Sequence, residues 1–208
     1  MSSAMPYWTG ARMASETHQA PSTARIEAFS DGVIAIIITI MVIDLRPPVD
    51  AIDAGLVTGV LGPMAPKLAS YALSFVIVAV MWVNHHELLR LAPGASRRLM
   101  WWNVNLLFWM SLIPMTTAIL GERVFLPAAQ ILYAAVGFAC ATSFTLLRIH
   151  ILRQSGSLGN RAAYLSIARS LVGPLFYLAA IAGTFAGPYV ALVMFCSVMV
   201  YFLFPLFR

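Results

Sequence analysis

Residues 25–44 decide the fold, and they read RIEAFSDGVIAIIITIMVID. A helix rises ~1.5 Å per residue, so about 20 apolar residues cross the ~30 Å hydrocarbon core of a bilayer. The stretch begins with a basic side chain, an aromatic ring, a hydroxyl and a carboxylate, which are Arg25, Phe29, Ser30 and Asp31. A carboxylate inside such a segment is costly unless it faces other helices or water. We therefore predict a membrane-spanning helix whose first part packs inside a bundle.

The composition extends this prediction to the whole chain. Of its 208 residues, 61% are hydrophobic and 10% are charged, whereas a soluble domain carries about 25% charged residues. We expect an all-α membrane protein with a flexible cytoplasmic tail at 1–22 and six transmembrane helices within 23–208. Internal prolines at 114 and 174 should be tolerated, because neighbouring helices can satisfy the freed backbone groups. The expected spans are 25–45, 67–89, 99–120, 127–149, 162–185 and 188–207.

The basic residues predict the orientation. Ten of the thirteen lysines and arginines fall on one side of this arrangement, and only Arg46, Lys67 and Arg123 fall on the other. The positive-inside rule then makes both termini cytoplasmic in a multi-pass protein of the cell membrane. Because the arginines sit between apolar runs and not on one soluble face, they do not indicate a nucleic-acid partner. Asp44 lies on the outer side, where it either concentrates cations at a pore mouth or is an ordinary solvated charge.

The first helix presents one apolar stripe. On a 3.6-residue wheel, Ile36 and Ile43 share a face with either Thr39 or Ile40, and the helical phase does not choose between the last two. Such a stripe is common on transmembrane helices that face lipid or other helices. Its significance therefore depends on what surrounds it.

The end of the second helix is the expected neighbour of Asp31. Asp31 follows Arg25 by six residues and His85 precedes Arg90 by five, so each lies about 8–9 Å along its helix from that arginine. Because Arg25 and Arg90 lie at the same side of the membrane, Asp31 and His85 should lie at a similar depth. Ser30 or Asp31 can then hydrogen-bond with the polar end of the second helix, which would hold the two helices together. A proton relay through the histidines is the alternative. The candidates on the second helix are Trp82, His85 and His86.

Motifs of enzymes do not occur in this sequence. His86-Glu87 is followed at the fourth position by Arg90, so the H-E-x-x-H metal site of metalloproteases is incomplete. No G-x-S-x-G, phosphate-binding loop or dinucleotide fingerprint is found. Cys140 and Cys196 lie inside apolar runs, as small buried side chains do. We expect no enzyme activity, no cofactor and no fixed metal ion.

The pattern R-x-x-x-F-S-D from Arg25 to Asp31 resembles the signature of the lysosomal potassium channel family, transmembrane protein 175, in its bacterial branch. W-x-x-H-H at the end of the second helix agrees with this resemblance, as do Pro114-x-Thr116 and Gly121-Glu122. The resemblance covers about residues 24–207. It departs from the family where isoleucine replaces leucine in the first helix and Met115 replaces an aromatic.

The resemblance implies a passive, potassium-preferring channel with K⁺ as permeant ion. Bacterial members have six helices per subunit and resemble homotetramers in the bilayer, with four first helices around a central pore. Like the family, this sequence lacks the T-V-G-Y-G filter. A hydrophobic constriction is implied instead, and a proton-coupled secondary transporter using Asp31 with His85 or His86 is the alternative. The implied constriction residues are Ile36, Thr39, Ile40 and Ile43.

Overall fold

The computed structural model describes residues 22–47 and 55–203. Of the predicted N-terminal tail, only Ser22 falls within this part of the chain. Every regular element there is helical: α1 (Ala24–Ile43), α2 (Gly62–Leu89), α3 (Arg97–Met110), α4 (Ile113–Glu122), α5 (Pro127–Gln154), α6 (Arg161–Ala186) and α7 (Pro188–Leu203). A π-helical turn, Leu56–Leu61, leads into α2, and a short 3₁₀ turn, Ser157–Gly159, joins α5 to α6.

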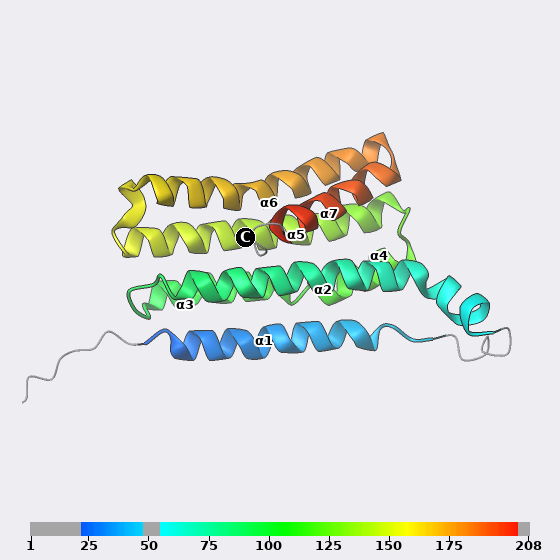
Figure 1. Ribbon diagram of the computed structural model, residues 1–208, viewed down its shortest axis with the longest axis horizontal. Coiled ribbons are helices and arrows are strands. Elements are labelled where there is room, and N and C mark those ends of the chain that lie inside the picture. Colours follow the sequence, from blue (N-terminus) through cyan, green and yellow to red (C-terminus); the bar gives the residue numbers. More distant parts are fainter. Residues whose placement is uncertain (1–21, 48–54, 204–208) are drawn as a thin grey trace, which may run out of the picture.

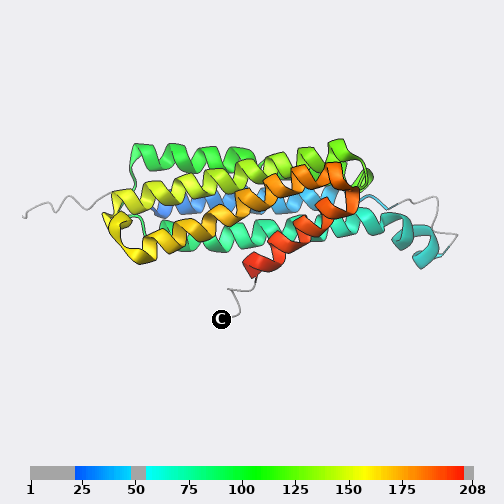
Figure 2. The same ribbon diagram turned by 90° about the horizontal axis from the view of Figure 1, so that it is seen from above.

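The helices form an up-and-down bundle in which α1 lies along one edge (Figure 1). It packs on α2, α3 and α4, whereas α5 and α6 form the opposite side of the bundle. The same bundle turned by 90° shows α7 crossing obliquely and ending near the middle of the long axis (Figure 2). Within residues 22–47 and 55–203, five spans are long and apolar enough to cross a membrane, with α3 and α4 together counted as one. The sixth predicted span is a shorter apolar helix, Pro188–Leu203, and positions 204–207 lie outside the described residues.

The third predicted span is present with Pro114 inside it, as expected, but it is divided into two helices. α3 ends at Met110 and α4 begins at Ile113, with Pro114 in the first turn of α4. Proline has no N–H to donate to the carbonyl of Met110, and its ring disfavours a helix before it. Pro174, by contrast, lies inside the continuous helix α6, as predicted.

Small side chains allow close contacts between the helices. Gly121 of α4 lies against the backbone of Lys67 in α2, because a Cβ built on Gly121 would be 3.0 Å from the Lys67 Cα. A Cβ on Gly137 of α5 would lie 2.4 Å from the ring of Tyr177 in α6. In a bilayer, where lipid is as apolar as leucine, such close packing holds helices together.

Candidate functional site

The candidate site is α1, whose two sides have opposite surroundings. The buried side packs against α2, α3 and α4 through Ile26, Ser30, Ile34, Ile37 and Met41, each of which is at most 7% exposed. These positions recur every three or four residues, so they form a continuous stripe. The helix is thus fixed in the subunit by one face only.

The other side of α1 has few partners within the described bundle. Ile36 is 58% exposed, Ile40 45% and Ile43 60%. Gly32 belongs to the same side, and a Cβ built there would meet no atom within 4 Å. All of the predicted constriction residues, Thr39 included, are therefore exposed in the isolated chain.

Thr39 differs from its isoleucine neighbours in carrying an oxygen on this exposed side. Its hydroxyl lies 3.0 Å from the carbonyl oxygen of Ala35 and 3.0 Å from that of Ile36, to which it can donate its hydrogen. A hydroxyl that donates back to its own helix keeps its lone pairs available as acceptors. Thr39 can therefore offer an oxygen to a cation.

A buried chain of hydrogen bonds joins α1 to α3 and α2. Ser30 donates its hydroxyl to the Ile26 carbonyl at 2.7 Å and accepts a bond of 2.8 Å from the side-chain amide of Asn103. The Oδ1 atom of Asn103 lies 2.7 Å from Nε2 of His85, which donates to it when that nitrogen carries the hydrogen. Ser30, His85 and Asn103 are each at most 1% exposed. A direct bond between Ser30 and His85 was one of several pairings left open by the sequence, and in the structure Asn103 lies between the two side chains.

Two further polar contacts connect α1 with the end of α2. The indole N–H of Trp82 donates to Oδ1 of Asp31 at 2.7 Å, one of the pairings expected from the sequence. His86 does not reach Asp31 or Ser30. Its Nδ1 atom lies 2.5 Å from Oε1 of Glu27, so this pair carries opposite charges when His86 is protonated. α1 and α2 are therefore joined near this end by two separate side-chain bridges.

Two residues of the R-x-x-x-F-S-D pattern stand apart from these bonds. Arg25 makes no hydrogen bond or ion pair with any other residue of the described ranges. Phe29 is 58% exposed and lies on the side of α1 that carries Ile36. Both side chains are exposed, so they do not belong to the buried core of the bundle.

The opposite end of α1 leads to Asp44, which follows the last helical residue and is exposed. Glu122, at the end of α4, lies 3.2 Å from the Lys67 ammonium group. This ion pair offsets the charge of Glu122. Asp44 remains as a candidate for the mouth of a pore.

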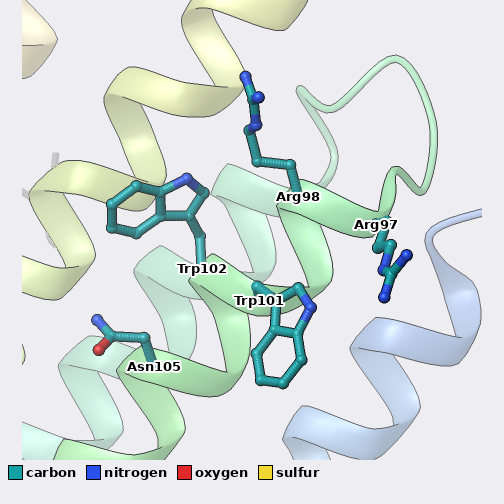
Figure 3. A pocket seen from close by; sticks show the side chains of 5 residues that line it. All are labelled: Arg97, Arg98, Trp101, Trp102 and Asn105. Atoms are coloured by element: carbon teal, nitrogen blue, oxygen red, sulfur yellow. The ribbon is translucent and has the colours of Figure 1, made fainter.

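A cluster of arginine and tryptophan side chains lies at the start of α3. Figure 3 shows Arg97 and Arg98 diverging at the N-terminal end of the helix, with the rings of Trp101 and Trp102 on the following turn. Trp101 is 66% exposed. Paired arginine and tryptophan are typical of the membrane–water interface. Asn105, the remaining labelled residue, donates to the Ser143 hydroxyl of α5 at 2.8 Å.

Asn103 and Asn105 of α3 both make contacts between helices. Sequence reasoning missed Glu27 as the partner of His86. The signal was present, because Glu27 lies four residues before Asp31 and so on a neighbouring position of the same helix surface.

Known proteins match the chain over most of its length. The family model described as endosomal/lysosomal potassium channel TMEM175 matches residues 25–114. A potassium channel of Chryseobacterium sp. (strain P1-3) is 35% identical over 182 residues, which are 87% of this chain and 92% of that one. The human endosomal/lysosomal proton channel TMEM175 is 28% identical over 187 residues, 81% of this chain but 37% of the human one.

A solved structure extends the match to the fold. The lysosomal potassium-selective channel TMEM175 homologue from Chamaesiphon minutus aligns with a TM-score of 0.78 and 30% sequence identity, covering 88% of this chain and 97% of that chain. The resemblance that the R-x-x-x-F-S-D pattern indicated is thereby confirmed. This chain belongs to the TMEM175 family of channels.

Proposed function

We propose that the chain is the subunit of a passive, potassium-selective channel in which α1 helices from four copies line one central pore. The bacterial relative from Chryseobacterium is named a potassium channel, and the solved relative is described as potassium-selective. A ring of identical subunits places the same face of α1 toward a common axis in every copy. The proposed assembly is a homotetramer in the cell membrane, with both termini on the cytoplasmic side.

The observation that carries this proposal is the unequal anchoring of α1. Its buried side is held by hydrogen bonds through Ser30 and Asp31, while its exposed side carries Ile36, Thr39 and Ile43. Such a polar anchor fixes the rotation of an edge helix in lipid. A pore helix requires a fixed rotation, because a small rotation would change the residues that face the axis.

Selectivity follows from dehydration at the isoleucine rings. A narrow apolar ring removes water from a cation without replacing it, and it can close by dewetting. Potassium holds its water less tightly than sodium does. Removing that water at the ring therefore costs less free energy for potassium than for sodium. Rings formed by Ile36 and Ile43 would supply this barrier, and oxygens from Thr39 would replace part of the lost water. Asp44 would attract cations to the outer mouth.

Ion flux from liposomes tests the pore assignment. Potassium flux should exceed sodium flux in the wild-type protein, and Ile36→Asn and Ile43→Asn should each bring the two fluxes closer together, because an amide in the ring replaces lost water for both ions. Leu175→Asn is the matched control, since Leu175 is 63% exposed on α6, away from α1. An unchanged potassium/sodium ratio in both α1 variants would refute the assignment.

A second pair of variants tests whether Thr39 or Ile40 forms the ring between those of Ile36 and Ile43. Thr39→Val removes an oxygen without changing the shape of the side chain, whereas Ile40→Thr introduces one. If Thr39 faces the axis, Thr39→Val should lower potassium flux and Ile40→Thr should change it little. The opposite pattern would assign the ring to Ile40.

A proton-coupled transporter is less well supported. A relay would need Asp31, His85 and His86 to be connected, but within the described ranges each bonds to a different side chain, namely Trp82, Asn103 and Glu27. Because the human relative is named a proton channel, the liposome assay should include a pH-sensitive dye. Saturating potassium flux coupled to proton movement would favour the transporter.

A further inference from the structure

A cavity of about 970 Å³ lies between α2, α5, α6 and α7, and α1 contributes no residue to its lining. Its size is at the upper end of the ~300–1,000 Å³ range of ligand sites. Most of its wall is apolar, and every one of the four helices contributes to it. Examples from the four helices are Ile77, Phe144, Leu165 and Phe202.

Two arginines line the cavity without an acidic partner. Arg148 of α5 is half-buried, donates to the hydroxyl of Ser166 in α6, and holds its guanidinium 5.2 Å from the centre of the Phe144 ring. Its Nε atom is fully buried and has no hydrogen-bond partner among the described residues. Arg169 of α6 lines the same cavity.

The charge of Arg148 therefore calls for an anion from outside the described chain. None of the side chains that line the cavity is Asp or Glu. A buried cation with an unsatisfied donor is costly, especially at membrane depth. A phosphate satisfies such a group well, because the planar guanidinium donates two parallel hydrogen bonds to it.

The position of the two arginines along the helices indicates where this anion belongs. Arg148 lies six residues before the end of α5 at Gln154, or about 9 Å along the helix axis. Arg169 lies eight residues after the start of α6 at Arg161, or about 12 Å. Long arginine side chains at this depth reach the lipid headgroup level. The apolar wall continues from there toward Tyr177, deeper in the bundle.

We propose that this cavity binds an anionic phospholipid, with its phosphate on Arg148 and Arg169 and an acyl chain along the apolar wall between α2 and α6. The combination of a charged rim with an apolar interior matches an amphiphile, whereas a free anion would leave the apolar wall uncovered. The site is independent of the pore assignment, because α1 contributes no residue to it.

Native mass spectrometry of the purified, delipidated protein tests the proposal. The protein is titrated with phosphatidylglycerol and with phosphatidylcholine of the same acyl chains. Phosphatidylglycerol should bind more tightly. Arg148→Gln and Arg169→Gln should each weaken its binding about tenfold, which is the smallest effect expected for a lost charge-assisted hydrogen bond. Arg153→Gln is the matched control, because Arg153 is exposed on α5 and does not line the cavity.

The Arg169→Gln variant separates lost lipid binding from misfolding. Arg148 is half-buried, so its replacement can disturb the bundle, but Arg169 is exposed and its replacement should leave the helicity by circular dichroism unchanged. Equal binding of the two lipids would overturn the proposal. So would a preference for phosphatidylglycerol that survives in both variants but disappears in Arg97→Gln/Arg98→Gln. Variants that bind lipid normally but assemble poorly would assign the cavity to a second copy of the chain.

Discussion

Replacing Asn103 with leucine should loosen α1 from the subunit. Asn103 donates to Ser30 at 2.8 Å and accepts from His85 at 2.7 Å, and all three side chains are buried. Leucine keeps a similar volume but leaves His85 without its acceptor and Ser30 without its donor. A transmembrane hydrogen bond contributes about 0.6 kcal/mol on average and at most about 1.7, while an unsatisfied buried group costs about 1–3 kcal/mol. The expected loss in the free energy of unfolding is thus roughly 1–3 kcal/mol.

A double-mutant cycle separates this bond from general damage. Asn103→Ala and Ser30→Ala are made singly and together, and unfolding by SDS in mixed micelles is followed by circular dichroism. The coupling energy should be about 0.6–1.7 kcal/mol. Asn105 is the matched control on the same helix, because its side chain bonds to Ser143 of α5 and makes no hydrogen bond to α1 among the described residues. A Ser30–Asn103 coupling no larger than the Ser30–Asn105 coupling would refute the reasoning.

Two further predictions concern the contacts between helices, and the same unfolding assay measures both. Trp82→Phe removes the indole nitrogen that lies 2.7 Å from Oδ1 of Asp31, so it should lower the free energy of unfolding by about 1.5–3 kcal/mol, as expected for a bond to a charged acceptor. Asp31→Asn keeps an acceptor and should lower it less. A larger loss in Asp31→Asn than in Trp82→Phe would contradict the assigned bond. Gly137→Ala places a Cβ 2.4 Å from the Tyr177 ring and should cost about 1–3 kcal/mol through overpacking. Gly159→Ala, with no atom within 4 Å of the new Cβ, should be neutral; similar losses in both glycine variants would argue against the close contact of α5 with α6.

The broad architecture could be predicted because membrane helices leave a strong signal in the sequence. Runs of about 20 apolar residues have few alternatives to a spanning helix, and the helical segments lie where the runs do. The first and last residues of the helices were less predictable. α2 begins at Gly62, five residues before the predicted start, since Pro63 suits the first turn of a helix and does not break it.

The interruption between α3 and α4 shows what a hydropathy pattern leaves out. Pro114 and Pro174 look alike in the sequence, each inside an apolar run. Pro114 coincides with a break, and the Thr117 hydroxyl donates to the Ile113 carbonyl in the turn that follows. Pro174 is buried inside a continuous helix. Which outcome occurs depends on the tertiary contacts around each proline, and these are not encoded in the run itself.

The residues of the candidate site could be predicted from the sequence, but not all of their hydrogen-bond partners could. The depth argument brought the end of α2 to Asp31, and Trp82 does bond to it. Depth alone could not give the rotation of each helix, so Asn103 was not expected between Ser30 and His85. A helix wheel fixes which residues share a face, whereas the pairing of faces needs the packed bundle.

The physics of the bilayer explains why the R-x-x-x-F-S-D pattern combines an apolar outer face with polar anchors. In water, the isoleucines of α1 would be driven into the core, and burial alone would set the rotation of the helix. In lipid that drive is absent, because the surroundings are as apolar as the core. Directional bonds must then hold the helix in one rotation, and Ser30 within the buried stripe and Asp31 beside it make such bonds. In the proposed pore, these bonds would determine which isoleucines reach the axis, so a variant such as Asn103→Leu should alter ion selectivity without changing any pore-lining residue.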